Sequence, residues 1–240
     1  MNDSRENTWV EQHFDIIHDF FKDPKYKKLV DNSLEIYELN RNPCFIFCLS
    51  ASKDLLSQWR AYSHDGSGVS IGFRTKNLTL KTHPNDNAIF PIDKINYGIS
   101  AQRNIISELC NKMRDKFDSE QNEIKKFNLR LAFGLSLVNW ALIFKNPNFK
   151  EEKEWRIVLH GPHNSHKDNS KSLSGMEFRI NSNKIISYYS YCFGNKFNSD
   201  LISEIVLGPK CKMSIKETEQ FLSYHNLGKT KIVISKSTYR

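Results

Sequence analysis

The sequence lacks most of the simple signals that assign a chain to a class of protein. It has no apolar run long enough to cross a membrane, no internal repeat, no low-complexity tract and no secretory signal sequence. Its five cysteines form no Cys-x-x-Cys pair and no zinc-ligand pattern. An odd cysteine count without a signal peptide indicates a reducing compartment, so we expect a cytoplasmic protein that has no membrane among its partners.

Glycine-rich phosphate motifs and long runs of like charge are also missing. Gly66 and Gly68 form a turn signal that is too short and wrongly placed for a P-loop or a dinucleotide fingerprint. The chain carries 35 Lys and Arg against 27 Asp and Glu, a net charge of +8. This balance suits a polyanionic partner such as nucleic acid or the phosphates of a nucleotide, but the basic residues are scattered, which is typical of a solvated surface.

What the sequence does contain is enough apolar material for one domain with a substantial core over residues 1–240. Helical periodicity predicts an N-terminal helical segment over 1–42 and a long helical insertion at about 101–145. Thr8 and Ser214 each begin a sequence with the form of a capping box. Apolar or alternating runs predict strands at 44–50, 69–73, 155–159, 176–180, 184–191, 204–208 and 231–235. We therefore predict the α+β class, with a mixed, mostly antiparallel sheet flanked by helices.

The most unusual stretch is residues 151–159, where carboxylates, an indole and a guanidinium precede an apolar strand. Side chains alternate along a strand, so Glu152, Glu154 and Arg156 are expected on one face, opposite Trp155. Burying unpaired charges costs free energy, so this face is expected to be solvated or to line a site. In a functional interpretation, one of these carboxylates stabilises a developing cation, acts as a general base or binds a metal ion. The structural interpretation is one exposed Glu–Arg pair at a strand end.

A second group of candidates follows the strand at 44–50. Ser50 and Ser52 lie at a strand-to-helix junction, where they could hold a ligand or where Ser52 could cap the next helix. Trp59 and Tyr62 are three apart on a predicted helix, so they share a face that could stack on a planar ring or belong to the core. Arg60 could bind a phosphate, although a lone Arg near a loop is usually solvated.

These pieces together resemble a bacterial family, domain of unknown function 2971. The most specific parts of the resemblance are the Glu-x-Glu-Trp-Arg of residues 152–156 and the Trp-x-x-Tyr of residues 59–62. It extends over Leu49–Ser52, Ile71–Phe73 and Glu204–Lys210, and so covers the chain from about residue 44 to the C-terminus. Family members begin with a short strand carrying Tyr and Arg and then an Asn-Asp-Pro loop, which this chain lacks before its first helix.

The order of the motifs is also similar to that of the ADP-ribosyltransferases, which use NAD. This similarity implies that Glu154 stabilises the oxocarbenium-like ribose as nicotinamide leaves, and that Glu152 orients or deprotonates the acceptor. The remaining residues that it assigns to the NAD site are Ser50, Ser52, Trp59, Arg60, Tyr62 and Arg156. The Arg or His that this superfamily usually carries on its first strand has no counterpart here.

The leading prediction is thus a bacterial enzyme that transfers ADP-ribose from NAD or hydrolyses NAD. It implies a protein or nucleic-acid acceptor, a setting in phage defence or toxicity, and a protein partner such as an antitoxin. One alternative is a basic nucleic-acid-binding module or a nuclease that holds a metal through Glu152, Glu154 and Asp54. Another is a non-catalytic partner-binding domain in which the Glu-x-Glu-Trp-Arg strand is structural.

Overall fold

The computed structural model describes residues 7–41, 44–78, 80–81, 90–160, 172–181, 183–194 and 197–238. The chain divides into two compact units, and each unit is made of two separate chain segments. Unit 1 comprises residues 1–49 and 92–161, and unit 2 comprises residues 50–91 and 162–240. Whether the two units form the single domain that the sequence predicts depends on how they combine. The single domain therefore stays a prediction.

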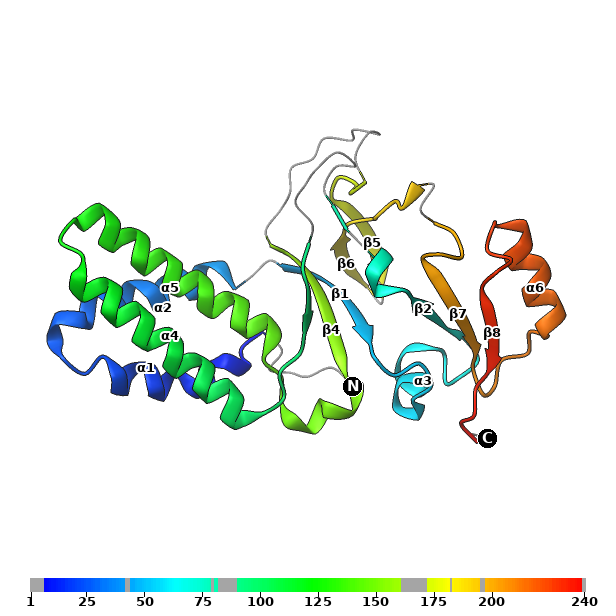
Figure 1. Cartoon of the computed structure of the whole chain (residues 1–240), viewed down its shortest axis with the longest axis horizontal. Coiled ribbons are helices and arrows are strands. Elements are labelled where there is room, and N and C mark those ends of the chain that lie inside the picture. The colour runs from blue at the N-terminus through cyan, green and yellow to red at the C-terminus, as the bar shows by residue number, and fades with distance from the viewer. Residues whose placement is uncertain are drawn as a thin grey trace. The chain divides into compact units, whose positions relative to one another are not determined.

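Unit 1 is built around a helical bundle. Its helices are α1 (Phe14–Phe20), α2 (Lys27–Asn40), α4 (Ile99–Ser119) and α5 (Glu123–Ile143), with short 3-10 helices η1 (Trp9–His13), η2 (Pro24–Tyr26) and η4 (Pro147–Glu152). Helix α5 packs against α2 and α4, and α4 packs against α1 (Figure 1). The bundle encloses an aromatic-rich core in which Phe21 lies edge-on to Tyr26 and Phe133. The predicted helical insertion therefore corresponds to α4 and α5.

Close packing of α2 on α5 depends on Gly134. A Cβ atom at this position would lie 2.6 Å from the carbonyl oxygen of Ser33 and 2.7 Å from Cβ of Ile36. Ser33 in turn donates a hydrogen bond from its hydroxyl to the Arg130 carbonyl at 3.0 Å. The two backbones thus meet at a point where no larger side chain fits.

The first helical turn of the chain does not form the capping box that the sequence indicates. Thr8 makes no side-chain cap hydrogen bond, and the helix starts as η1 rather than as an α-helix. The Glu11 carboxylate instead accepts hydrogen bonds from the Tyr37 hydroxyl at 2.9 Å and from Arg41 at 3.3 Å. Because Tyr37 on α2 and Arg41 at its end bind the Glu11 carboxylate, this carboxylate does not complete the capping box.

Unit 1 also contains the sheet β1–β4–β3, formed by β1 (Cys44–Ser50), β4 (Glu154–His160) and β3 (Ile92–Lys94). Strand β3 runs antiparallel to the central strand β4, with Asp93 opposite Arg156 and Lys94 opposite Trp155. Strand β1 has the predicted bounds, and its last residue, Ser50, is the first residue of unit 2.

Unit 2 is organised around the sheet β2–β7–β8, formed by β2 (Val69–Phe73), β7 (Ile202–Leu207) and β8 (Lys231–Ile234). Strands β2 and β7 are antiparallel, whereas β7 and β8 are parallel and are therefore joined by a crossover that contains α6 (Ile215–Tyr224). Helix α6 begins with the predicted capping box of Ser214 and Glu217. Unit 2 also contains α3 (Leu56–Tyr62), η3 (Thr75–Asn77) and the hairpin of β5 (Glu177–Asn181) and β6 (Lys184–Tyr188).

The α+β class is confirmed, with small and mostly antiparallel sheets accompanied by helices (Figure 1). The strands named above fall into three sheets, β1–β4–β3, β2–β7–β8 and β5–β6. Residues 161–171, which follow β4, lie outside the described residues.

Candidate functional site

The Glu-x-Glu-Trp-Arg motif enters β4 through a sharp local turn. Asn146 caps η4 by accepting a hydrogen bond from the Asn148 amide at 2.9 Å, and Pro147 occupies the first turn of this 3-10 helix. Lys153 then ends η4 in the left-handed conformation, with φ of 46° and ψ of 46°. This residue reverses the chain between Glu152, which closes η4, and Glu154, which opens β4.

Four charged side chains of unit 1, Lys145, Glu152, Glu154 and Arg156, form what we call the charge cluster. Lys145 Nζ lies 2.6 Å from Glu152 Oε2 and 2.8 Å from Glu154 Oε2. Arg156 binds Glu154 from the same strand, with Nε 2.7 Å from Oε1 and Nη2 3.2 Å from Oε2. Both carboxylate oxygens of Glu154 are thus held by cations.

The charge cluster is anchored to the backbone around it. Arg156 Nη1 donates to the carbonyl oxygen of Leu142 at 2.8 Å, and the amide of Glu154 donates to the Tyr97 hydroxyl at 3.0 Å. Arg156 is fully buried and Glu154 is 6% exposed. The two cations and two carboxylates balance, so the cluster as a whole is neutral.

Protonation in the charge cluster follows from these contacts. Burial acts to raise the pKa of Glu154, but the hydrogen bond and charge of Arg156, together with Lys145, outweigh it and hold this pKa below its ordinary value. Burial acts to lower the pKa of Lys145, but its hydrogen bonds to Glu152 and Glu154 outweigh it and raise this pKa. Both groups are therefore ionised at neutral pH.

The charge cluster corrects two expectations about β4. Glu152 does not share a strand face with Glu154, because it lies in η4 and is brought to Lys145 by the turn at Lys153. The face that carries Glu154 and Arg156 is buried rather than solvated, and its charges compensate one another. Lys145, which has no sequence motif around it, supplies the compensating cation that the sequence did not reveal.

Unit 2 contains a small recess, which we call the ring pocket, of about 160 Å³. It brings together three of the predicted NAD-site residues: Ser52, Trp59 and Tyr62. The other residues that line it are Lys53, Gln58, Ser63, Val69 and Ser70.

The two aromatic residues of the ring pocket differ in exposure. Trp59 is buried at 3% exposure, and its indole N–H donates to Asp54 Oδ1 at 2.7 Å. Tyr62, one helical turn further along α3, is 66% exposed. Trp59 therefore forms a buried wall, whereas most of the Tyr62 side chain is exposed to solvent.

Two further predicted residues lie beside the ring pocket but do not line it. The Ser50 hydroxyl accepts a hydrogen bond from the Ser52 amide at 3.0 Å and so shapes the turn after β1. Ser52 does not cap α3, because Leu55 occupies that position without a side-chain cap bond. Arg60 is exposed on α3 and is not among the lining residues.

Sequence reasoning missed the polar groups that surround this pocket. No described residue makes a side-chain hydrogen bond with the Gln58 side-chain amide or with the hydroxyls of Ser52 and Ser70. All three side chains are partly exposed. Spacing offered one signal for Gln58, because residues 58 and 62 are four apart and lie on the same side of a helix.

Asp54, a metal ligand in the nuclease alternative, has a different role in unit 2. Its carboxylate accepts hydrogen bonds from Trp59, from the Ser235 and Ser237 hydroxyls at 2.5 and 3.1 Å, and from the Lys236 amide at 2.7 Å. These bonds outweigh burial and lower the pKa of Asp54. Within the described ranges, no group of three or more His, Cys, Asp or Glu side chains could hold a metal ion.

The candidate residues therefore gather in two places. Glu152, Glu154 and Arg156 belong to unit 1, and Ser52, Trp59 and Tyr62 belong to unit 2. The similarity to ADP-ribosyltransferases assigns both groups to one NAD site, and this assignment stays a prediction. None of the helices in the described part of the chain is long and apolar enough to span a membrane.

The fold and the charge cluster define an α+β protein with a neutral, buried ion network on its central strand β4. Residues 58–157 match the family model described as Protein of unknown function (DUF2971), which confirms the family resemblance for this segment. The match includes Trp59, Tyr62 and the Glu-x-Glu-Trp-Arg motif, whereas Ser50 and Ser52 lie before it. No curated protein and no solved structure matches the chain, and the similarity to ADP-ribosyltransferases gains no support from these comparisons.

Proposed function

We propose that this chain binds NAD through the ring pocket of unit 2, and that the Glu-x-Glu-Trp-Arg strand has a structural role. The observation that carries the proposal is the grouping of Ser52, Trp59 and Tyr62 in one recess with Gln58, whose side-chain amide bonds to no described side chain. Small-molecule sites combine aromatic walls with a few polar groups whose hydrogen bonds are unsatisfied.

The chemistry of the nicotinamide end suits this recess. A volume of about 160 Å³ is small, so the recess would take one planar ring and leave the rest of the dinucleotide outside. The ring is cationic in NAD, and aromatic faces such as that of Tyr62 attract cations. An amide such as that of Gln58 has both a donor and an acceptor for the carboxamide of nicotinamide.

The charge cluster supports binding more strongly than catalysis. A carboxylate stabilises a developing cation when its negative charge is not already compensated. Here Lys145 and Arg156 lie 2.8 and 2.7 Å from the oxygens of Glu154. Glu154 would have to exchange these partners for a ribose, at the cost of breaking a buried ion pair.

ADP-ribosyl transfer or NAD hydrolysis is the second candidate, with Glu154 facing the ribose and Glu152 orienting the acceptor. One observation favours it: the lowered pKa of Glu154 keeps this carboxylate ionised, which is the state that the reaction requires. The acceptor would be a protein or a nucleic acid. A role in phage defence or toxicity, with an antitoxin-like protein partner, belongs to this candidate.

Calorimetric titration with NAD tests the binding proposal. We expect Tyr62→Ala to weaken binding about three- to tenfold, because an aromatic stacking contact contributes about 0.5–1.5 kcal/mol. Gln58→Leu should weaken it about tenfold by leaving the carboxamide unpaired. Tyr224→Ala is the matched control, since Tyr224 is 85% exposed on α6 and lies outside the ring pocket. Absence of NAD binding by the unaltered chain would overturn the proposal.

Turnover separates the two candidates. The unaltered chain and Glu154→Gln are incubated with NAD, with and without cell extract as a source of acceptor, and free nicotinamide is measured. Binding without nicotinamide release supports the structural role of β4. Release that is lost in Glu154→Gln, in a variant whose melting curve shows a folded protein, supports the enzyme instead.

A further inference from the structure

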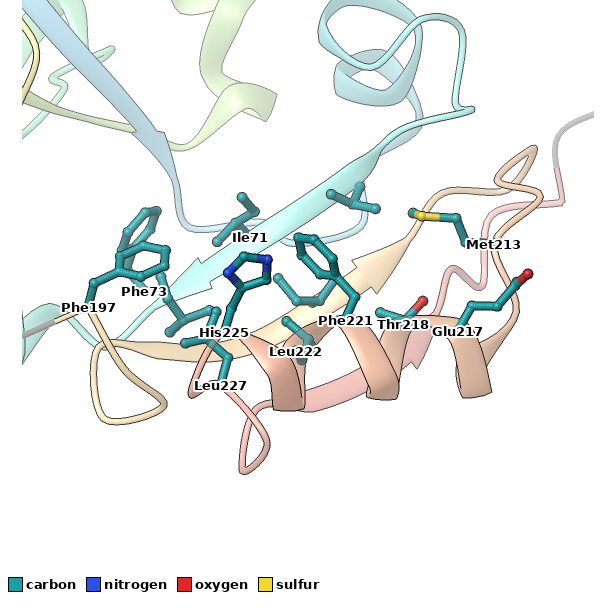
Figure 2. Close-up of a pocket in the computed structure, with 13 residues that line it drawn as sticks. Ile71, Phe73, Phe197, Met213, Glu217, Thr218, Phe221, Leu222, His225 and Leu227 are labelled. Carbon is teal, nitrogen blue, oxygen red and sulfur yellow. The ribbon is translucent and has the colours of Figure 1, made fainter.

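A larger recess, which we call the apolar groove, lies in unit 2 between the sheet and α6. It has a volume of about 520 Å³, within the range of small-molecule pockets. Strands β2 and β7 form one wall, and α6 with the segment after it forms the other (Figure 2). The lining residues are Val69, Ile71, Phe73, Phe197, Ile202, Ile205, Met213, Glu217, Thr218, Phe221, Leu222, His225 and Leu227.

The walls of the apolar groove carry large apolar side chains that are exposed to solvent. Ile71 on β2 is 51% exposed and Phe221 on α6 is 61% exposed, and both project into the groove (Figure 2). Phe73 and Phe197 lie at one end, and Met213 and Glu217 lie at the other. The groove is therefore an elongated apolar channel, suited to a chain or a narrow ring system.

A second recess, which carries lysines, adjoins the groove at its Met213 end. This lysine hollow, of about 490 Å³, is lined by Ser67, Lys210, Cys211, Lys212, Met213 and Glu217. Met213 and Glu217 line both recesses, so the two are adjacent at this end.

The charged side chains of the lysine hollow differ in whether they form ion pairs or hydrogen bonds within the protein. Lys210 forms an ion pair with Asp65 at 2.8 Å. The Glu217 carboxylate is taken by the helix cap, where it accepts from the Ser214 amide at 2.8 Å and from the Ser214 hydroxyl at 2.7 Å. Lys212 makes no ion pair with any described residue. A lysine without an ion-pair partner among the described residues thus lies in the recess next to the apolar groove.

We propose that the apolar groove binds a free anionic amphiphile, such as a medium-chain carboxylate, with its chain along α6 and its head group at Lys212. Apolar contact supplies the affinity, and the lysine selects the charged end. This site is separate from the proposed NAD site, with which it shares Val69.

Decanoate is the first probe, and decanamide is its neutral counterpart. We expect saturable binding of decanoate below its micelle concentration, stronger than that of decanamide. Octanoate should bind about fifteenfold more weakly, because it lacks two methylenes and each buried methylene contributes roughly a factor of four. Phe221→Ser and Ile71→Ser, on opposite walls, should each weaken both probes by about tenfold, and Lys212→Ala should weaken decanoate alone.

Matched controls lie on the same helix. Tyr224→Ser replaces a side chain that is 85% exposed on α6 and lies outside the groove. Lys216→Ala removes a lysine of α6 that lines neither recess. Both should bind decanoate like the unaltered chain. Equal loss in Phe221→Ser and Tyr224→Ser, or no saturable binding of decanoate, would overturn the proposal. Binding seen only with decanoate micelles or phosphatidylglycerol vesicles would also overturn it, in favour of a lipid surface.

Discussion

Arg156 holds Glu154 two residues away on the same strand, with Nε 2.7 Å from Oε1 and Nη2 3.2 Å from Oε2. A side-by-side pair of this kind uses both carboxylate oxygens and leaves the guanidinium free to reach the Leu142 carbonyl. It joins β4 to the end of α5. The pair therefore connects the sheet and the helical bundle of unit 1.

Breaking this pair should destabilise unit 1 strongly. Arg156→Met leaves Glu154 buried beside a single cation, and Glu154→Gln leaves Arg156 buried without its counter-charge. We expect each change to lower the free energy of unfolding by about 3–5 kcal/mol, measured by urea denaturation. Glu151→Gln, at an exposed neighbouring carboxylate, should change it by less than about 0.5 kcal/mol. Similar values for all three variants would contradict the buried charge cluster.

The charge cluster also predicts how stability depends on acid. The pKa of Glu154 is lower in the folded chain than its ordinary value, so its contribution is fully present above that ordinary value and is lost as pH falls through the lowered pKa. The free energy of unfolding of Glu154→Gln should therefore fall less steeply in acid. Asp54 and Asp118, whose pKa values are also lowered, retain their part of the slope in this variant. An unchanged acid slope would contradict the prediction.

Asp54 should order the segment that follows β8. Asp54→Asn removes the charge that receives bonds from Trp59, Ser235, Ser237 and the Lys236 amide. Charge-assisted hydrogen bonds contribute about 1.5–3 kcal/mol, so we expect a loss of this size and faster amide exchange at residues 235–237. Asp65→Asn, which breaks an exposed pair with Lys210, is the control and should leave that exchange unchanged.

Gly134→Ala should destabilise the bundle even though Ala is the better helix former. The added methyl would meet the Ser33 carbonyl oxygen at 2.6 Å and Ile36 Cβ at 2.7 Å, so α2 and α5 must separate. We expect overpacking to cost about 1–3 kcal/mol against a propensity gain of about 1 kcal/mol. Thermal melting measures the balance, and Gly98→Ala, whose new Cβ has ordinary 3.6 Å contacts, serves as the comparison. A melting temperature above that of the unaltered chain would contradict close packing here.

Local signals in the sequence predicted the elements that depend on local physics. The apolar run of residues 44–50 and the alternation of residues 69–73 correspond to β1 and β2. The Ser214 capping box formed as the sequence predicts, because Ser214 and Glu217 hydrogen-bond to each other within the first turn of α6. The same pattern at Thr8 failed because Tyr37 and Arg41 hold Glu11.

The candidate site was predictable in part. Residues of one helical face, such as Trp59 and Tyr62, do line one pocket. The partner of Glu154 was not predictable, because Lys145 reaches it from the end of α5 and carries no motif. The turn at Lys153 was hidden for a similar reason, since a left-handed residue is usually Gly or Asn.

The division of each unit into two chain segments has a consequence for synthesis on the ribosome. Strand β2 pairs with β7. The Ser203 hydroxyl donates a hydrogen bond to the Gly72 carbonyl oxygen, and these two residues are 131 positions apart in the chain. At roughly 5–20 residues per second, β2 waits about 7–26 seconds for its partner strand to be made. Throughout this interval Val69, Ile71 and Phe73 have no β7 to pair with, whereas the helical bundle of unit 1 is completed within it, when α5 ends at Ile143. Nascent chains of this protein should therefore be clients of ribosome-associated chaperones until residue 207 has emerged.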